Sequence, residues 1–109
     1  MNDTSLLEHT QRLLADPLLN GESVDEKICY LLKEEYLRRL AQYRRAIFLL
    51  GQKYGMSFDE FVSRRIVQQE NFSWHVETDA MDWETAVSGI KTMERKLKAL
   101  GNVKDAQDK

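Results

Sequence analysis

Hydrophobic residues recur at alternating steps of three and four over two long segments of this chain. Such spacing is typical of helices that pack along one face. In the first segment the recurring positions are Tyr36, Leu40, Tyr43, Ile47, Leu50 and Tyr54. In the second segment they are Trp83, Ala86, Ile90, Met93, Leu97 and Leu100. The pattern predicts two long amphipathic helices, over residues 24–54 and 79–100, that pack against each other as an antiparallel pair.

Capping signals mark the ends of the first long helix and the start of a shorter one. Ser23 opens a capping box with Glu26, in which both side chains accept hydrogen bonds from backbone N–H groups of the first turn. Gly55 suits the left-handed position that ends a helix. Ser57 then opens a second capping box, which predicts a helix over residues 58–69 that packs across one end of the pair.

The remaining segments carry weaker signals of the same kind. Residues 5–15 have helical spacing and stop before Pro17, because a residue that precedes proline is pushed out of the α region. Residues 71–77 alternate between apolar and polar, and we interpret them as a connector, since one isolated strand has nothing to pair with. Gly101 is expected to stop the last helix, and the polar residues 102–109 to form a disordered tail.

Together these elements predict an all-α fold, a small helical bundle dominated by the long antiparallel helix pair. Residues 1–101 form its single domain. The composition agrees, because 42% hydrophobic and 31% charged residues are typical of a globular chain. One proline and five glycines are too few turn formers for an all-β fold.

The first long helix has more apolar surface than one neighbour covers. A second stripe beside the first consists of Tyr30, Leu37, Ala41 and Phe48. At about 1.5 Å per residue this helix is roughly 46 Å long and its companion roughly 32 Å, so about 14 Å stays uncovered. Either residues 5–15 or a second copy covers it, and we favour a homodimer. The predicted dimer interface residues are Tyr36, Leu37, Leu40, Tyr43 and Ile47.

Charge, hydropathy and cysteine content exclude several classes of protein. The net charge is -2 and the pI about 5.7, so no overall basic field attracts nucleic acid. No apolar run approaches the roughly 20 residues of a membrane span, and the amino terminus lacks the features of a secretory signal. Cys29 is the only cysteine, which suits a reducing compartment. We therefore expect a cytoplasmic protein.

The charge is distributed unevenly along the chain. Residues 71–88 contain four acidic residues and no basic one, while residues 23–54 and 89–109 each carry a surplus of three basic residues. An acidic surface with an exposed tryptophan suits a basic protein partner, since tryptophan is enriched in binding hot spots. Alternatively both tryptophans face the core and the acids only complement the helix dipole. Trp83 lies in the seam and is expected in the core. The predicted partner-binding residues are Trp74, Glu77, Asp79, Asp82 and Glu84.

No pattern of an enzyme is present in the sequence. It has no glycine-rich phosphate loop, nucleophile elbow, His-Glu-x-x-His motif or paired cysteines. His75, Glu77, Asp79 and Asp82 fit the spacing of a divalent-metal site only loosely, and a solvated helix start explains them better. We therefore expect no catalytic residue, no cofactor and no bound metal.

A helix-turn-helix DNA-binding protein is the first alternative function. The junction around Gly55 resembles that motif, and arginine doublets occur on the adjoining helices. However, the expected recognition helix begins with Asp59 and Glu60, which would place two carboxylates where DNA phosphates approach. Nucleic acid is therefore a disfavoured partner.

The segment from Lys53 to Phe61, followed by a short helix and an acidic helix start with tryptophan, resembles a known protein family. Its members are small helical proteins found beside toxins of the TumE type and treated as their antitoxins. The resemblance spans about residues 35–100. It implies a non-enzymatic protein that binds a basic, ribonuclease-like toxin and covers its active surface. A structural homo-oligomerisation module is the second alternative.

Overall fold

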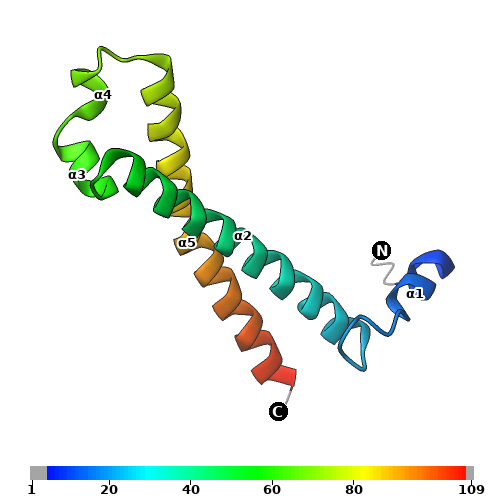
Figure 1. The fold of residues 1–109 in the computed structure, drawn as a ribbon. Helices are drawn as coiled ribbons and strands as arrows, with labels where there is room; N and C mark the ends of the chain where they lie inside the picture. The colour runs from blue at the N-terminus through cyan, green and yellow to red at the C-terminus, as the bar shows by residue number, and fades with distance from the viewer. Residues whose placement is uncertain (1–4, 108–109) are drawn as a thin grey trace.

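The structure is a computed structural model that describes residues 5–107, and side chains as far as residue 101 (Figure 1). The described residues are all-helical, with no strand among them. The helices are α1 (Glu8–Leu14), α2 (Val24–Tyr54), α3 (Phe58–Ser63), α4 (Ile66–Gln69) and α5 (Trp74–Gln107). No helix in this part of the chain is long and apolar enough to cross a membrane.

Helix α2 begins and ends where the capping signals predict. The Ser23 hydroxyl accepts a hydrogen bond from the Glu26 N–H at 3.1 Å, while the Glu26 carboxylate accepts one from the Glu22 N–H at 2.7 Å. At the other end, Gly55 has a φ of 66° and donates its N–H to the Gly51 carbonyl at 2.8 Å. Helices carry these signals in a few adjacent residues, so a local pattern was enough to predict the bounds of α2.

The single helix predicted over residues 58–69 is wrong, because the chain breaks at Arg65. This residue adopts the left-handed conformation, with a φ of 53°, and separates α3 from α4. Phe61 and Ile66 are both buried. In one continuous helix, residues five positions apart point about 140° away from each other, so one of these two side chains would face solvent. The break lets both enter the same core.

The connector predicted over residues 71–77 is also wrong, because α5 already begins at Trp74. The Ser73 side chain accepts a hydrogen bond from the Val76 N–H at 3.3 Å, which makes it the cap of this helix. Asn71 and Phe72 both have positive φ angles and form the turn before it. Of the apolar connector residues only Val76 is buried, where it reaches the core.

At its other end α5 passes through Gly101 and continues to Gln107, so the predicted stop at Gly101 is wrong. The residues predicted as a disordered tail, 102–109, therefore lie partly in this helix. Residues 108–109 lie outside the described part of the chain. Residues 1–4 lie outside it as well.

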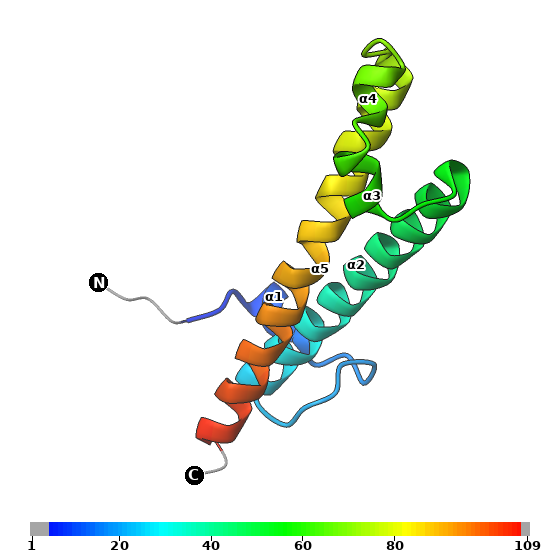
Figure 2. The ribbon, with the colours of Figure 1, turned by 90° about the vertical axis from the view of Figure 1, so that its left-hand side faces the viewer.

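Helices α2 and α5 lie side by side over most of their length (Figures 1 and 2). Tyr54 of α2 is bonded to Asp79 of α5, and the Tyr36 ring lies 5.8 Å from Lys96 Nζ. The later α2 residue therefore meets the earlier α5 residue. Three buried residues mark the contact between them, Leu40, Ala86 and Met93.

The main core lies where α3 and α4 cover the first part of α5. Its buried members are Phe61, Ile66, Val76 and Trp83. Tyr54 and Phe58 add aromatic packing, since their ring centroids lie 5.9 and 5.5 Å from that of Trp83. Trp83 is 1% exposed, which confirms its expected place in the core. This cluster anchors the acidic part of α5 to α2 and α3.

The chain is elongated. It measures 57 × 31 × 31 Å and its radius of gyration is 20.0 Å, whereas a compact domain of this length has about 13 Å. Helix α1 stands beside the amino-terminal end of α2 and does not run along it (Figure 1). There the Lys27 ammonium donates to the Leu14 carbonyl at 2.6 Å. Helix α1 therefore leaves most of α2 uncovered.

Candidate protein-binding interface

The acidic first half of α5 presents its charged side chains in two different settings. Glu77, Asp82 and Glu84 are exposed, as the sequence predicts for a partner-binding surface. Asp79 is not, because its side chain is only 14% exposed. The predicted set of five residues is thus divided between solvent and the contact with α2.

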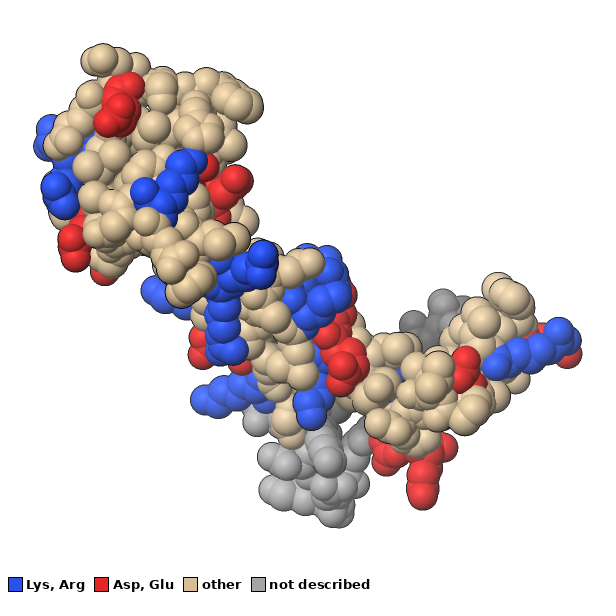
Figure 3. Space-filling view, viewed as in Figure 1, with Lys and Arg blue, Asp and Glu red and all other residues tan. Residues whose placement is uncertain are grey.

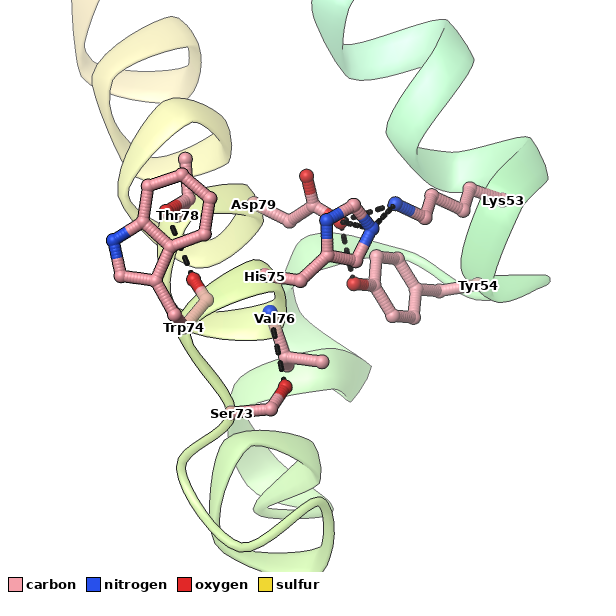
Figure 4. A network of polar contacts seen from close by, with 8 residues as sticks. All are labelled: Lys53, Tyr54, Ser73, Trp74, His75, Val76, Thr78 and Asp79. Carbon is pink, nitrogen blue, oxygen red and sulfur yellow. Dashed lines mark hydrogen bonds and ion pairs between the residues drawn. The ribbon is translucent and has the colours of Figure 1, made fainter.

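Asp79 is held in a network that joins α5 to the end of α2 (Figure 4). Its carboxylate accepts hydrogen bonds from Lys53 Nζ and from the Tyr54 hydroxyl, both at 2.6 Å. His75 Nε2 lies 3.7 Å from the same oxygen and contacts Lys53 Nζ. The prediction that Asp79 is free to bind a partner is therefore revised, because its charge is already paired within the chain.

The network shifts the pKa of both acidic groups within it. Burial by itself would raise the pKa of Asp79, but the hydrogen bonds from Lys53 and Tyr54 outweigh burial and lower it below the usual range. Burial and the bond to Asp79 raise the pKa of Tyr54 to about 12. The Asp79 carboxylate and the neutral Tyr54 phenol are therefore the forms that stabilise this end of the helix pair.

Trp74 lies on the other side of α5 from this network (Figure 4). Its side chain is 79% exposed. The Thr78 hydroxyl donates a hydrogen bond to the backbone carbonyl of Trp74 at 2.8 Å. Because this bond does not involve the indole, the ring stays accessible to another molecule. Of the two placements that the sequence left open for Trp74, core or surface, the structure has the surface one.

An apolar groove flanks this surface. It has a volume of about 290 Å³ and runs along the surface between α3 and α4 on one side and α5 on the other. Val62 lines it on the α3 side and Met81 on the α5 side. Val62 is 57% and Met81 68% exposed, and Phe72 at the turn is 58% exposed. The sequence did not indicate this groove, because the groove depends on the break at Arg65, which periodicity did not predict.

The residues predicted as the dimer interface mostly face α5 of the same chain. Leu40 is 5% exposed, and Ile47 packs against the main core. The Tyr43 ring lies so close to Gly89 that a Cβ there would come within 2.5 Å of it. Tyr36 meets Lys96, as described above. Leu37, at 40% exposed, is the member of the predicted set that keeps a substantial free surface.

Basic residues gather over the middle of the helix pair (Figure 3). Two of them are paired, since Glu35 accepts hydrogen bonds from Arg38 and Arg39 at 2.7 to 2.8 Å. The hydrogen bond from Arg38, and to a smaller extent the one from Arg39, lowers the pKa of Glu35 to about 2. Arg44 and Arg45 form no ion pair with any described residue. Acidic residues therefore prevail on the first half of α5, and basic residues over the middle of the helix pair.

Within the described residues, no group of three or more His, Cys, Asp or Glu side chains is placed to hold a metal ion. Cys29 is half-buried and lines a hollow of about 540 Å³ together with Tyr30 and Leu97. Comparison with protein-family models, with curated proteins and with solved structures found no match for this chain.

Proposed function

We propose that this protein is a non-enzymatic binding module that holds a basic protein partner against the first half of α5. The observation that carries this proposal is the exposed indole of Trp74 on the same face of α5 as the carboxylates of Glu77 and Glu84, which form no ion pair with any described residue. In this proposal α2 and α5 form an antiparallel pair that serves as a rigid support, while the exposed face supplies the contact.

The surface has the chemistry of a small interface. A tryptophan that is 79% exposed gains much from burial in a partner's pocket, and water exclusion around it strengthens neighbouring charge pairs. Met81 and Val62 extend the apolar area beside it. Because Trp83 and the Asp79 network fix α5 in place, little conformational entropy is lost when a partner binds.

An antitoxin-like inhibitor is the concrete form of the proposal. A ribonuclease-like toxin needs basic residues to hold RNA phosphates, and a row of carboxylates competes for the same residues. Glu77 and Glu84, seven positions apart on one face of α5, provide two such carboxylates. The resemblance to antitoxins beside TumE-type toxins supports this choice of partner over other basic proteins.

DNA binding is the weaker alternative. Helix α3, the expected recognition helix, spans only Phe58–Ser63 and has Asp59 and Glu60 in its first turn. Both carboxylates are exposed there and would repel DNA phosphates. The Ser57 hydroxyl accepts from the Glu60 N–H at 3.2 Å, so the first turn of α3 is explained by helix capping alone.

The test is co-expression of the chain with the product of a neighbouring gene that encodes a short basic protein. We expect a stable complex that weakens as salt rises, since exposed charges are screened beyond about 10 Å at 0.1 M. Glu77→Lys/Glu84→Lys should weaken it at least about tenfold, and Trp74→Ala by roughly thirtyfold if this side chain is a hot spot.

The matched control is Glu34→Lys/Glu94→Lys, which makes the same change of charge at exposed positions away from the surface. It should leave affinity within about threefold. Equal affinity of the two double variants, or binding of a DNA duplex more tightly than the basic protein, contradicts the proposal.

A further inference from the structure

Helix α5 has a second line of residues at alternating steps of three and four, on the side turned away from α2. We call it the outer seam, and its members are Trp74, Glu77, Met81, Glu84, Ser88, Lys91, Arg95 and Lys98. All eight are exposed, whereas the buried Trp83, Ala86 and Met93 of the same helix belong to the inner seam. Residues at this spacing share one face of the helix and can meet a neighbouring helix together.

The charges of the outer seam are sorted by sign. Its first half carries Glu77 and Glu84, and its second half carries Lys91, Arg95 and Lys98. Some charges elsewhere in the chain are paired, as Glu35 is with two arginines. Within the described residues, the charged members of the outer seam form no ion pair. The seam therefore presents one acidic and one basic surface without a partner of either sign.

We propose that the outer seam binds the outer seam of a second copy of this chain, in antiparallel orientation. The point halfway between Glu84 and Lys91 is also halfway between Glu77 and Lys98. A twofold axis at that point sets each glutamate of one copy opposite a lysine of the other. One symmetric contact thus pairs both glutamates and both lysines of each copy.

Sizes complement each other about the same axis. Ser88, a small residue, lies beside the axis and permits close approach of the two helices. Trp74 comes opposite Gly101 of the second copy, and a Cβ at Gly101 would meet nothing within 4 Å in the single chain. A parallel arrangement would instead set glutamate against glutamate and lysine against lysine, so charge selects the antiparallel one.

This contact does not depend on the function proposed above, but it affects that function. The second copy covers Trp74, Glu77 and Glu84, which are the residues that a basic partner would use. Self-association and partner binding therefore exclude each other on this face. The protein would be released from its own dimer when the partner is present.

Charge reversal tests the pairing in the full chain. Sedimentation velocity at low salt should show self-association of the natural chain, weakened at least about tenfold in Glu77→Lys/Glu84→Lys and in Lys91→Glu/Lys98→Glu. Mixing these two variants should restore association as a heterodimer, because one then carries only bases on the seam and the other carries four acids against the single base Arg95. A chain with all four reversals should again associate with itself. Circular dichroism checks that each variant keeps its helices.

Cross-linking tests the position of the axis. Cys29→Ser removes the natural thiol, and Ser88→Cys then places one thiol beside the proposed axis, where mild oxidation should give a disulfide-linked dimer. Asp82→Cys is the matched control, since Asp82 is exposed on α5 but lies outside the outer seam. It should give at least about tenfold less cross-linked product under the same conditions.

Three results overturn the proposal. One is a chain that stays monomeric at high micromolar concentration and low salt. Another is a dimer that withstands both double reversals but dissociates on Phe48→Asp, which would assign the contact to the exposed stripe on α2, where Phe48 is 61% exposed. The last is an equal yield of cross-link from Ser88→Cys and Asp82→Cys.

Discussion

Single residues in this protein have roles that depend on which neighbour they meet. Asp79 and Asp82 are three positions apart on one helix, yet one is bonded to Lys53 and Tyr54 while the other is exposed. Gly51 and Gly89 are both inside long helices, but only the second touches an aromatic ring. These two pairs allow direct comparisons.

Asp79→Asn should lower the free energy of unfolding by roughly 1 kcal/mol at neutral pH, since it removes the charged acceptor of two hydrogen bonds, one from a partly exposed lysine. Because the folded pKa of Asp79 is lowered, its contribution is present above the unfolded pKa of about 3.9 and is lost as pH falls through the folded pKa. Urea unfolding of both chains at pH 7 and in strong acid measures this. Asp82→Asn is the control and should change little; equal losses would contradict the role of the network.

Gly89→Ala should destabilise the protein by about 1–3 kcal/mol, because the new Cβ would lie 2.5 Å from the Tyr43 ring and force it to move. Gly51→Ala should stabilise it by about 0.5–1 kcal/mol, since alanine favours helices and the nearest atom to its Cβ is 3.6 Å away. Thermal unfolding distinguishes the two. If both substitutions stabilised the chain, α2 and α5 would pack less closely than described.

At the scale of the element, each helix end is decided by a few adjacent residues. The turn between α2 and α3 combines a left-handed Gly55 with a serine cap at Ser57. Helix α5 lacks such a stop at Gly101 and continues beyond it. Substitution of Gly55 should therefore lower the stability of the protein, whereas substitution of Gly101 should raise it.

Ser57→Ala should cost about 1 kcal/mol through the lost cap of α3. Gly55→Val should cost more, because a β-branched residue is strained at a φ of 66°. Thr85→Ala, an exposed helical position, is the control and should change stability by less than about 0.5 kcal/mol. Unchanged melting of both turn variants would mean that α2 and α3 are joined in another way.

Gly101→Ala should raise the helical signal in circular dichroism and stabilise the end of α5, by up to about 1 kcal/mol, because Gly101 lies inside the helix and space around it is open. Gly55→Ala provides the comparison and should have the opposite sign. A loss of stability in Gly101→Ala would show that this glycine ends the helix in a left-handed conformation.

The whole molecule is a long helix pair with its main core at one end. Few side chains are fully buried for a chain of this length, and large apolar residues such as Phe48 stay more than half exposed. Small-angle scattering at low concentration and high salt, where the monomer should prevail, is expected to give a radius of gyration close to 20.0 Å. A value near the roughly 13 Å of a compact domain would require α1 or the end of α5 to fold back.

The sequence by itself determined the helical class, the bounds of α2 and the place of Trp83 in the core. These follow from periodicity and from caps, which involve residues within one or two turns of each other. It also indicated Trp74, Glu77, Asp82 and Glu84 as accessible, although the binding role of this surface stays a prediction.

Only the tertiary structure decided where α3 breaks, where α5 begins and which face of α2 is free. The break at Arg65 exists because Phe61 and Ile66 reach one core, and Asp79 is paired because Lys53 comes from a distant part of the chain. Most of the α2 residues predicted to contact a second copy of the chain pack against α5 instead. Apolar spacing shows that a helix face needs a neighbour, but not which helix supplies it. Contacts between residues far apart in the chain leave no mark on local spacing, and for that reason only the folded chain reveals them.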